Sequence, residues 1–555
     1  MKILFSTALV LGLAGSAFAQ YPTIPKDVQE ASDAMLGEAR KRSDEAWAKA
    51  LPTIQYDARH GKPYIPWASR PTDLPQADMP AFPGAQGGGA FSFGGHGGRP
   101  IVVTSLEDSG PGTFREACEQ GGARIIVFNV AGIIKLKTPV IIRAPYVTIA
   151  GNTAPGDGVC IAGESVWINT HDVVIRYMRF RRGETNVGRR DDSIGGNPVG
   201  NIMIDHVSAS WGLDENMSMY RHMFDPGDGS KEQKLGTVNI TIQNSIFSEA
   251  LDTYNHAFGS TLGGENCMFV RNLWADNAGR NPSVGWNGIF NFVNNVVFNW
   301  NHRSTDGGDW TALFNIINNY YKPGPVTPKD NPVGHRFVKP ESGRSKLDHK
   351  EFGRVYASGN IMEGNDKVTA NNWDGGVQVE ELHNAGEYTE LMRTDKPLPM
   401  PAVTIMTAKE AYSYVLDNAG ATLPKRDAVD VRITEQVRTG KITYKEINTD
   451  NAYQFEHRKL NKDSYKLGII TDPSQVGGYP EYKGTPYQDD DNDGMPNDWE
   501  QRYGLNPKDA KDAMTDLSGD GYSNIEKYIN GIDPKKKVNW KDPKNNVDVI
   551  AKRAK

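Results

Sequence analysis

The sequence predicts an all-β solenoid of stacked parallel strands, followed by a small segment of acidic loops. Short β-rich runs recur from about residue 82 to about residue 370, and their starts lie roughly 23 to 40 residues apart. No amphipathic helix of about 10 to 15 residues separates these runs, which disfavours a doubly wound sheet. A stack of coils joined by variable loops fits this spacing.

The runs are rich in β-branched and aromatic residues, which favour strands. They cover residues 173–180, 201–210, 239–247, 267–274, 290–300, 313–321 and 354–362. Asn244, Asn272, Asn295 and Asn319 occupy similar offsets in successive runs. Stacked coils would place these amides over one another in a hydrogen-bonded ladder, whereas turn-forming asparagines placed by chance are the alternative.

The composition is that of a globular protein of two or three units. The chain has 555 residues, of which 38% are hydrophobic and 23% charged, with a net charge of −6. This balance gives no bias toward nucleic acid. The three cysteines, Cys118, Cys160 and Cys267, are too few and too far apart for a disulfide framework or a zinc site, so we expect them to be buried apolar residues.

Residues 1–19 have the features of a secretory signal peptide: Lys2, an apolar stretch and an Ala-Phe-Ala cleavage site. The protein is therefore expected to be secreted or periplasmic, and no later run is long enough to span a bilayer. Residues 20–81 form a leader with helical spacing over 28–51, followed by prolines that disfavour regular structure. Residues 82–370 form the solenoid.

Residues 371–485 are expected to fold back along the flank of the solenoid as a cover and linker. Their β pattern fades, and helical spacing is found at 408–419 and 427–438.

Residues 486–540 contain two acidic loops and are expected to form an EF-hand-like calcium-binding module. In the first loop, oxygen ligands occupy the required spacing and a glycine stands at position 6. The second loop is an imperfect copy whose acid falls at position 11. Solvated acidic linkers are the alternative. The predicted ligands are Asp489, Asp491, Asp493, Glu500, Asp516 and Asp520.

A second acidic cluster lies within residues 189–216, around one β-rich run. Its acids are Asp191, Asp192, Asp214 and Glu215, and acids brought together from successive strands can hold a hard cation such as Ca²⁺. Asp191 is the weakest candidate, because Arg189 and Arg190 are adjacent partners.

Basic residues are concentrated just before this cluster. The arginines are Arg176, Arg179, Arg181, Arg182, Arg189 and Arg190. They predict a positive field facing an acidic ligand, for which a polyuronate is suitable because arginine binds carboxylates in a bidentate manner. Some of them are alternatively structural partners of the neighbouring acids.

Four motifs in order resemble the pectate lyases of polysaccharide lyase family 1. They are the run from Arg176 to Arg181, Asp192-Ser193-Ile194, Ile204-Asp205-His206 and Arg280-Asn281-Pro282. Asp214-Glu215 after Ser210-Trp211 is similar to a bacterial branch of this family. The resemblance covers roughly residues 82–330 and implies a right-handed parallel β-helix.

The resemblance also implies an activity, calcium-dependent β-elimination of an acidic plant polysaccharide such as polygalacturonate. Asp192, Asp214 and Glu215 would be calcium ligands, Asp205 a structural or secondary residue, and Arg280 the base. The family often has a second arginine where this chain has Gly285, and often a lysine before Phe258. The expected substrate-binding residues are His256, Arg271, Arg303 and Arg181.

Two alternatives remain open at the sequence level. A polygalacturonase-type hydrolase would use paired carboxylates such as Asp191 and Asp192, but the Gly95-His96-Gly97 motif precedes them instead of following. A non-catalytic carbohydrate-binding β-helix is also compatible with the solenoid. We expect a monomer that binds neither nucleic acid nor a membrane.

Overall fold

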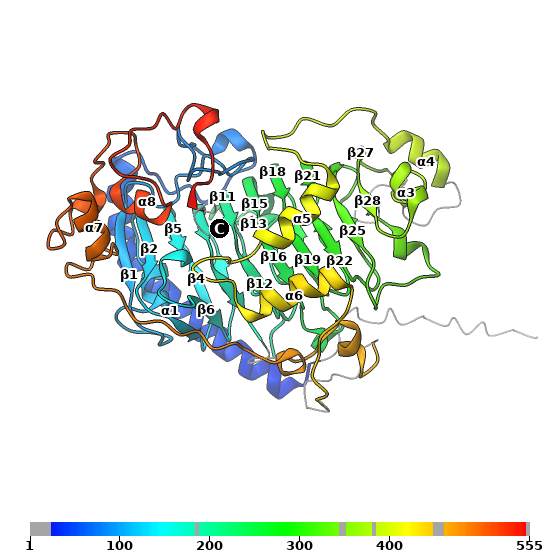
Figure 1. Ribbon diagram of the computed structural model, residues 1–555, viewed down its shortest axis with the longest axis horizontal. Helices are drawn as coiled ribbons and strands as arrows, with labels where there is room; N and C mark the ends of the chain where they lie inside the picture. Colours follow the sequence, from blue (N-terminus) through cyan, green and yellow to red (C-terminus); the bar gives the residue numbers. More distant parts are fainter. Residues whose placement is uncertain (1–23, 184–187, 343–350, 380–384, 448–459, 551–555) are drawn as a thin grey trace, which may run out of the picture.

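The predicted parallel β-helix is confirmed by a computed structural model, which describes residues 24–183, 188–342, 351–379, 385–447 and 460–550. The predicted signal peptide lies outside these residues. The coils stack along the long axis of the molecule, with the N-terminal coils at one end (Figure 1). Every strand pairing between successive coils is parallel within the described residues, so the strands form a solenoid and not an antiparallel meander.

Two long sheets form two faces of the β-helix. The first is β1(Arg99–Val103), β2(Arg124–Phe128), β5(Val147–Ala150), β8(His171–Arg176), β11(Gly200–Asp205), β15(Val238–Gln243), β18(Glu265–Val270), β21(Ile289–Val293), β24(Leu313–Ile317) and β27(Val355–Ser358). The second is β3(Gly132–Lys135), β6(Val159–Ala162), β9(Arg179–Arg181), β12(Ser208–Ser210), β16(Ile246–Ser248), β19(Leu273–Ala275), β22(Val296–Phe298), β25(Tyr320–Lys322) and β28(Ile361–Met362).

The third face is interrupted in its middle. One part is β4(Val140–Ile142), β7(Val166–Ile168) and β10(Ile194–Gly196), and the other is β17(Thr261–Leu262), β20(Ser283–Val284), β23(Thr305–Gly307) and β26(Val338–Pro340). Single bridges, Ile194 to Met217 and Met219 to Leu262, connect the two parts. An antiparallel hairpin, β13(Arg221–Phe224) and β14(Gln233–Gly236), projects at the interruption.

Each β-rich run of the sequence is two strands and a corner, so the prediction of single strands needs correction. In the run 173–180, β8 ends at Arg176 and β9 begins at Arg179. Tyr177 between them has φ 55°, and His206 and Asn244 hold the corresponding left-handed corner in the next two coils. Apolar side chains continue through the corner, so the hydrophobic pattern does not mark it.

The interior of the coils is a continuous apolar core. Ile175, Ile204, Ile242, Phe269 and Phe292 stack through the first sheet with no exposed surface. Short helices close both ends of this core: α2(Phe114–Glu119) covers the first coil, and α3(Asp366–Ala370) and α4(Ala385–Met392) contribute buried residues at the last. The three cysteines are buried and free, as predicted.

The asparagine ladder is confirmed for three of its four predicted members. Asn295 Oδ1 accepts hydrogen bonds from the backbone and side chain of Asn272, and Asn319 Oδ1 accepts the same pair from Asn295. Asn360 continues the series. Asn244 does not belong to it, because Asn244 occupies the left-handed corner and the backbone N–H of Ser245, one residue on, donates to Asn272 Oδ1 instead.

Replacing Asn295 with alanine should lower the free energy of unfolding by about 1–3 kcal/mol, because it removes the side-chain partner of two buried backbone groups on the preceding coil, the Asn272 N–H and the Phe269 carbonyl. Urea denaturation would measure the loss. Asn461→Ala, at an exposed position, is the matched control and should change stability by less than about 0.5 kcal/mol. Equal stability of the two variants would contradict a structural role for the ladder.

Helices from outside the solenoid cover its flanks. The leader forms α1(Lys26–Arg59), which is longer than the predicted 28–51 and packs Ala50 and Ile54 against Ala144 (Figure 1). The segments 408–419 and 427–438 form α5(Ala408–Asn418) and α6(Ala428–Thr439), which cover the outer face of the second sheet. No helix among the described residues is long and apolar enough to cross a bilayer.

The C-terminal acidic loops pack on the first coils. Met495, Ala513, Ile525 and Ile529 share one buried cluster with residues of β2. The segment includes α7(Asn497–Tyr503) and α8(Asn524–Ile529), drawn in orange and red beside β1 and β2 in Figure 1. The apolar contact indicates that this segment is part of the outer layer of the β-helix.

Candidate functional site

The acids of residues 192–215 and Arg280 meet on the third face, where its sheet is interrupted. Bridges pair Glu215 with Phe258 and Phe258 with Gly279, so these three residues lie on successive coils. The bridge from Ile194 to Met217 sets Asp192 one coil before Glu215. The register of the coils therefore brings together residues that are almost ninety positions apart in the sequence.

The resulting groove has a volume of about 590 Å³ and combines both signs of charge. Its acidic residues are Asp191, Asp192, Asp214 and Glu215. Its basic residues are Arg40, Arg190, Arg221, Lys234 and Arg280. Three of the predicted cation ligands and the predicted base thus face the same space.

Arg280 is held against Glu215 at the floor of the groove. It has φ 52°, and its guanidinium forms an ion pair with Glu215 Oε1 while lying 4.6 Å from the centroid of the Phe258 ring. Thr261 Oγ1 also donates to Glu215 Oε1, at 2.7 Å. Burial alone would lower the pKa of Arg280, but the charges of Glu215 and Asp214 raise it above its ordinary value.

Asp192 lies beside Glu215 and Asp214 and is partly exposed. Burial raises the pKa of its carboxyl well above the ordinary range, and the nearby charges of Glu215 and Asp214 raise it further. Its Oδ1 accepts a hydrogen bond from the Glu215 backbone N–H at 3.1 Å. Three carboxylates so close together are costly without a counter-charge, which is the arrangement of a cation site.

His256 fixes the remaining acid. Its Nε2 lies 2.6 Å from Asp214 Oδ1, and Asp214, Glu215 and His256 each offer a ligand atom within 4.8 Å of the others. Burial would raise the pKa of Asp214, but the hydrogen bond from His256 and the charge of Arg280 lower it. Asp214 is therefore held as a carboxylate beside Glu215.

A second cavity, of about 440 Å³, adjoins the groove on the far side of Phe258. His256, His302 and Arg303 line it. The Arg303 guanidinium lies 4.7 Å from the Phe258 centroid, so Phe258 is flanked by Arg280 and Arg303. The structure thus brings the predicted residues His256 and Arg303 to the edge of the same site.

Sequence reasoning missed the residues of the hairpin and Phe258. Tyr220, Arg221 and Lys234 line the groove from β13, β14 and the residue before them. Lys234 Nζ lies 4.3 Å from the centroid of Trp286. The turn-rich stretch 225–230, between two polar strands, was the available signal for a hairpin, but it carries no catalytic motif.

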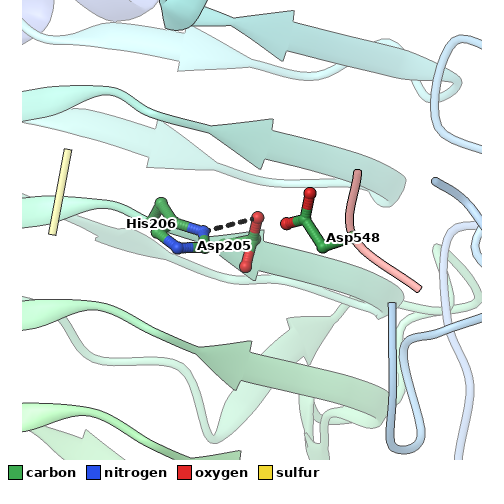
Figure 2. Close-up of side chains that lie close together, drawn as sticks. All are labelled: Asp205, His206 and Asp548. Carbon is green, nitrogen blue, oxygen red and sulfur yellow. Dashed lines mark ion pairs between the residues drawn. The ribbon is translucent and has the colours of Figure 1, made fainter. Parts of the chain in front are cut away.

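Asp205 has a structural role, which is one of the two roles predicted for it. Its Oδ2 accepts from Arg176 Nε at 2.8 Å, and Asp548 from the C-terminal segment also pairs with Arg176. Asp205 Oδ2 lies 2.9 Å from His206 Nδ1, and Figure 2 shows Asp548 beside this pair. The side chains of Asp205, His206 and Asp548 lie close together, but Arg176 already supplies the positive charge that pairs with the carboxylates of Asp205 and Asp548. This cluster is a buried ion-pair network.

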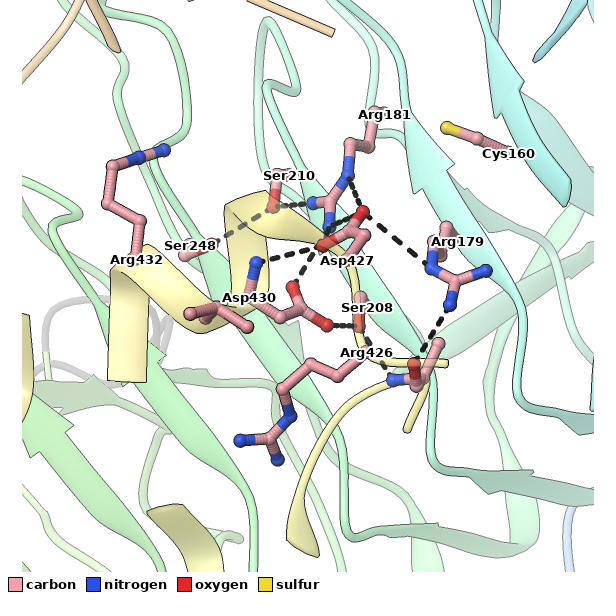
Figure 3. Close-up of polar contacts among 12 residues, drawn as sticks. Cys160, Arg179, Arg181, Ser208, Ser210, Ser248, Arg426, Asp427, Asp430 and Arg432 are labelled. Atoms are coloured by element: carbon pink, nitrogen blue, oxygen red, sulfur yellow. Dashed lines mark hydrogen bonds and ion pairs between the residues drawn. The ribbon is translucent and has the colours of Figure 1, made fainter. Parts of the chain in front are cut away.

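The prediction that Arg181 binds substrate is wrong. Arg181 has no exposed surface, and its Nη2 lies 2.8 Å from Asp427 and 2.9 Å from Asp430 at the start of α6 (Figure 3). Alternate residues of β9 point outward, and α6 covers that face, so the side chain points away from the groove. Asp191 forms ion pairs with Arg182 and Arg189, so these two arginines are structural partners of a neighbouring acid, as the alternative interpretation predicts.

Arg271, which is also predicted to bind substrate, lies away from the groove. It occupies the left-handed corner after β18, with φ 56°, and only 5% of its surface is exposed. Its Nε donates to Asn244 at 3.0 Å, and its Nη1 donates to Gln86 at 3.2 Å. These partners lie on the corner between the two long sheets, so Arg271 does not reach the groove on the third face.

The C-terminal acids divide into two different sites. Asp489, Asp491 and Asp493 come together as predicted, and Glu500 lies with Asp493 beside Asp512, which the sequence analysis missed because it lies outside the loop motif. Asp516 and Asp520, which are also predicted calcium ligands, both pair with the buried ammonium of Lys527.

Similarity to known proteins agrees with this site. A probable pectate lyase C of Aspergillus flavus is 33% identical over 459 residues, which cover 82% of this chain and 94% of that protein. The probable pectate lyase C of Aspergillus fumigatus is 34% identical over 474 residues, with the same coverage of both chains.

Other comparisons are more distant. A pectate lyase structure from Bacillus sp. N165 in complex with trigalacturonate is 15% identical, covers 61% of this chain and 98% of that chain, and has a TM-score of 0.38. No family model matches the chain. On the strength of the Aspergillus relatives, together with the groove just described, the chain belongs to the pectate lyase family and is a polysaccharide lyase.

Proposed function

We propose that this chain cleaves polygalacturonate by calcium-dependent β-elimination, with Arg280 as the base and a 4,5-unsaturated oligogalacturonide as the product. One observation carries the proposal: Asp192, Asp214, Glu215 and Arg280 face one groove, although they come from three different coils. Asp214 and Glu215 offer ligand atoms within 4.8 Å of each other and of His256, and Asp192 lies close enough for their charges to raise its pKa, so this group of carboxylates fits a hard divalent cation.

The reaction removes the C5 proton of a uronate and breaks the C4–O bond, and the departing oxygen takes up a proton from solvent. Calcium bound by the three acids would contact the substrate carboxylate and stabilise the charge that develops next to C5. Arg280 must approach C5 to about 3 Å, which requires it to leave Glu215. Arg280 must also release its own proton to solvent before it can accept the C5 proton, and the charges of Glu215 and Asp214, which raise the pKa of Arg280, oppose that release while the ion pair with Glu215 persists.

The remaining cations of the site are suited to hold neighbouring uronates. Arg303 and His256 lie on one side of Phe258, and Lys234 and Arg221 lie on the hairpin side. A polyanion that crosses the groove would meet positive charge at both ends, with Phe258 beneath it. This placement favours an unesterified chain, because methyl esters would remove the charges that these residues recognise.

Replacing Asp192 with asparagine should raise the calcium concentration needed for half-maximal activity by about 10- to 100-fold, because it removes one charged ligand from the site. Titration of calcium against initial rate would measure the shift. Glu107→Gln, at an exposed position outside the groove, is the control and should leave the requirement unchanged. An unaltered calcium requirement in Asp192→Asn would place the ion elsewhere.

The product distinguishes a lyase from a hydrolase on the same fold. Polygalacturonate treated with the wild-type chain should gain ultraviolet absorbance from the new C4–C5 double bond, in proportion to the number of new chain ends. New reducing ends without that absorbance would show hydrolysis and would overturn the elimination mechanism.

We also propose that the protein is secreted, in keeping with the signal peptide predicted at residues 1–19, and that Asp489, Asp491, Asp493 and Glu500 hold a second, structural calcium ion. These four acids lie on the outer layer of the first coils, away from the groove. The second ion would stabilise the protein without taking part in the reaction.

A further inference from the structure

The C-terminal segment contains two loops of the same construction. The first loop is residues 489–500, and the second loop is residues 516–527. Gly494 N–H donates to Asp489 Oδ2 at 3.0 Å, and Gly521 N–H donates to Asp516 Oδ2 at 2.7 Å. The side chain of Asn497 accepts from the second residue of its loop, and that of Asn524 does the same. The two backbones are therefore equivalent, position by position.

The two loops differ at the last position, where the first has Glu500 and the second has Lys527. In a calcium loop of this type, the twelfth residue is the glutamate that contributes two oxygens to the ion. A lysine at this position cannot be a ligand, because its ammonium has donors and no acceptor. It can, however, supply a positive charge of its own.

Lys527 places its ammonium among the ligand positions of its own loop. Its side chain has no exposed surface. Its Nζ forms an ion pair with Asp516 Oδ1, lies 2.6 Å from Ser518 Oγ and lies 3.2 Å from Asp520 Oδ1. These are positions 1, 3 and 5 of the second loop, the same positions that Asp489, Asp491 and Asp493 occupy in the first.

The first loop has no such internal cation. Both carboxylate oxygens of Glu500 and one of Asp493 are buried without a hydrogen-bond partner, and neither residue has exposed surface. Asp512, from the segment between the loops, adds a further unpartnered oxygen within 4.8 Å of both. Among the residues that the structure describes, no lysine, arginine or histidine forms an ion pair with any of these carboxylates.

We propose that the C-terminal segment binds one divalent cation and not two: the first loop takes the ion with Asp512 as an additional ligand, and the ammonium of Lys527 replaces the ion in the second loop. This inference is independent of the lyase activity. The desolvation of several carboxylates must be offset by a cation in both loops, and the two loops meet this requirement in different ways.

The difference between the loops determines which contacts depend on metal. The second loop binds the leader, because Tyr522 donates to the Pro80 carbonyl at 2.6 Å, and Glu526 also lies 2.8 Å from His96 at the start of the solenoid. The first loop packs closely against β2. A side chain at Gly494 would come within 2.4 Å of Val127, and Met495 is fully buried in the same cluster as Val127. Loss of metal should therefore loosen the contact with β2 and leave the contact with the leader in place.

The test is the number of calcium ions bound per full-length chain, measured by equilibrium dialysis followed by elemental analysis. Lys527→Glu restores the twelfth ligand and should bind one ion more than the wild type. Glu500→Gln combined with Asp512→Asn should bind one ion fewer. Any ion in the catalytic groove contributes equally to all three chains, so the differences report the two loops alone.

Asp520→Asn keeps Lys527 in place and should leave the number of bound ions unchanged. A loss of one ion in this variant would show that the wild-type second loop binds calcium, and the proposal would fail. A folded Lys527→Glu chain that binds no extra ion would overturn it as well. Elimination activity on polygalacturonate, assayed in parallel, should be retained in all the variants, which separates this test from that of the proposed function.

Discussion

Arg280→Ala is expected to lower kcat for elimination on polygalacturonate by about 10²- to 10⁴-fold, because the variant loses the group that is proposed to accept the C5 proton. Arg280 comes from the second coil after that of Glu215 and forms an ion pair with Glu215 beside the ring of Phe258. The initial rate of double-bond formation at saturating substrate and calcium would measure the loss.

The control for this variant is Arg393→Ala. Arg393 also lies over an aromatic ring, with its guanidinium 5.5 Å from the centroid of Trp373, but it is at the far end of the β-helix and should leave kcat unchanged. Binding of a short oligogalacturonate to Arg280→Ala should persist, since Arg303 and His256 remain. If Arg280→Ala kept more than about a tenth of the wild-type kcat, another residue would have to be the base.

Asp427→Ala is expected to produce the largest loss of stability, about 3–5 kcal/mol in the free energy of unfolding. Asp427 caps α6 by accepting from the Asp430 N–H at 2.9 Å, and it lies 2.8 Å from Arg181 and 3.6 Å from Arg179. Its removal leaves two buried guanidinium groups with too little negative charge and the helix without its cap (Figure 3). Urea denaturation followed by circular dichroism would measure the change.

A matched control lies in the preceding helix. Asp417 pairs with Arg438 at 2.5 Å, but both side chains are about half exposed, so Asp417→Ala should cost at most about 1 kcal/mol. The contrast between these two aspartates tests whether burial, and not the mere presence of an ion pair, determines the effect. Similar losses for both variants would argue against the buried network as the anchor of α6.

The repeating part of the fold was predictable because each coil carries its own signal. The β-rich runs, the ladder asparagines and the helical spacing of α5 and α6 are local patterns that recur or extend over several turns. The corners were not predictable, since apolar residues continue through them and only a backbone angle changes, as at Tyr177. Asn244 was assigned to the ladder for this reason, although Ser245 occupies the position.

The candidate site was predictable where a motif carried it and not where packing decided. Asp192, Asp214, Glu215 and Arg280 belong to motifs with a recognisable order, and the structure brings them together. Arg181 and Arg271 carry the positive charge that substrate binding requires, but segments from elsewhere in the chain cover them. No local sequence pattern predicts which flank of the solenoid is covered. Lys527 was missed because the loop motif considers only oxygen ligands, whereas a lysine at the twelfth position supplies a positive charge of its own.

The contact between Arg176 and Asp548 joins residues separated by 372 positions. A ribosome adds these two residues at widely different times, so the pocket around Arg176 and Asp205 stays open for most of the synthesis of the chain. The last coil-covering residues to be made are also those that close the earliest coils. The ion pair between Arg176 and Asp548 can therefore form only after the C-terminal segment has been synthesised.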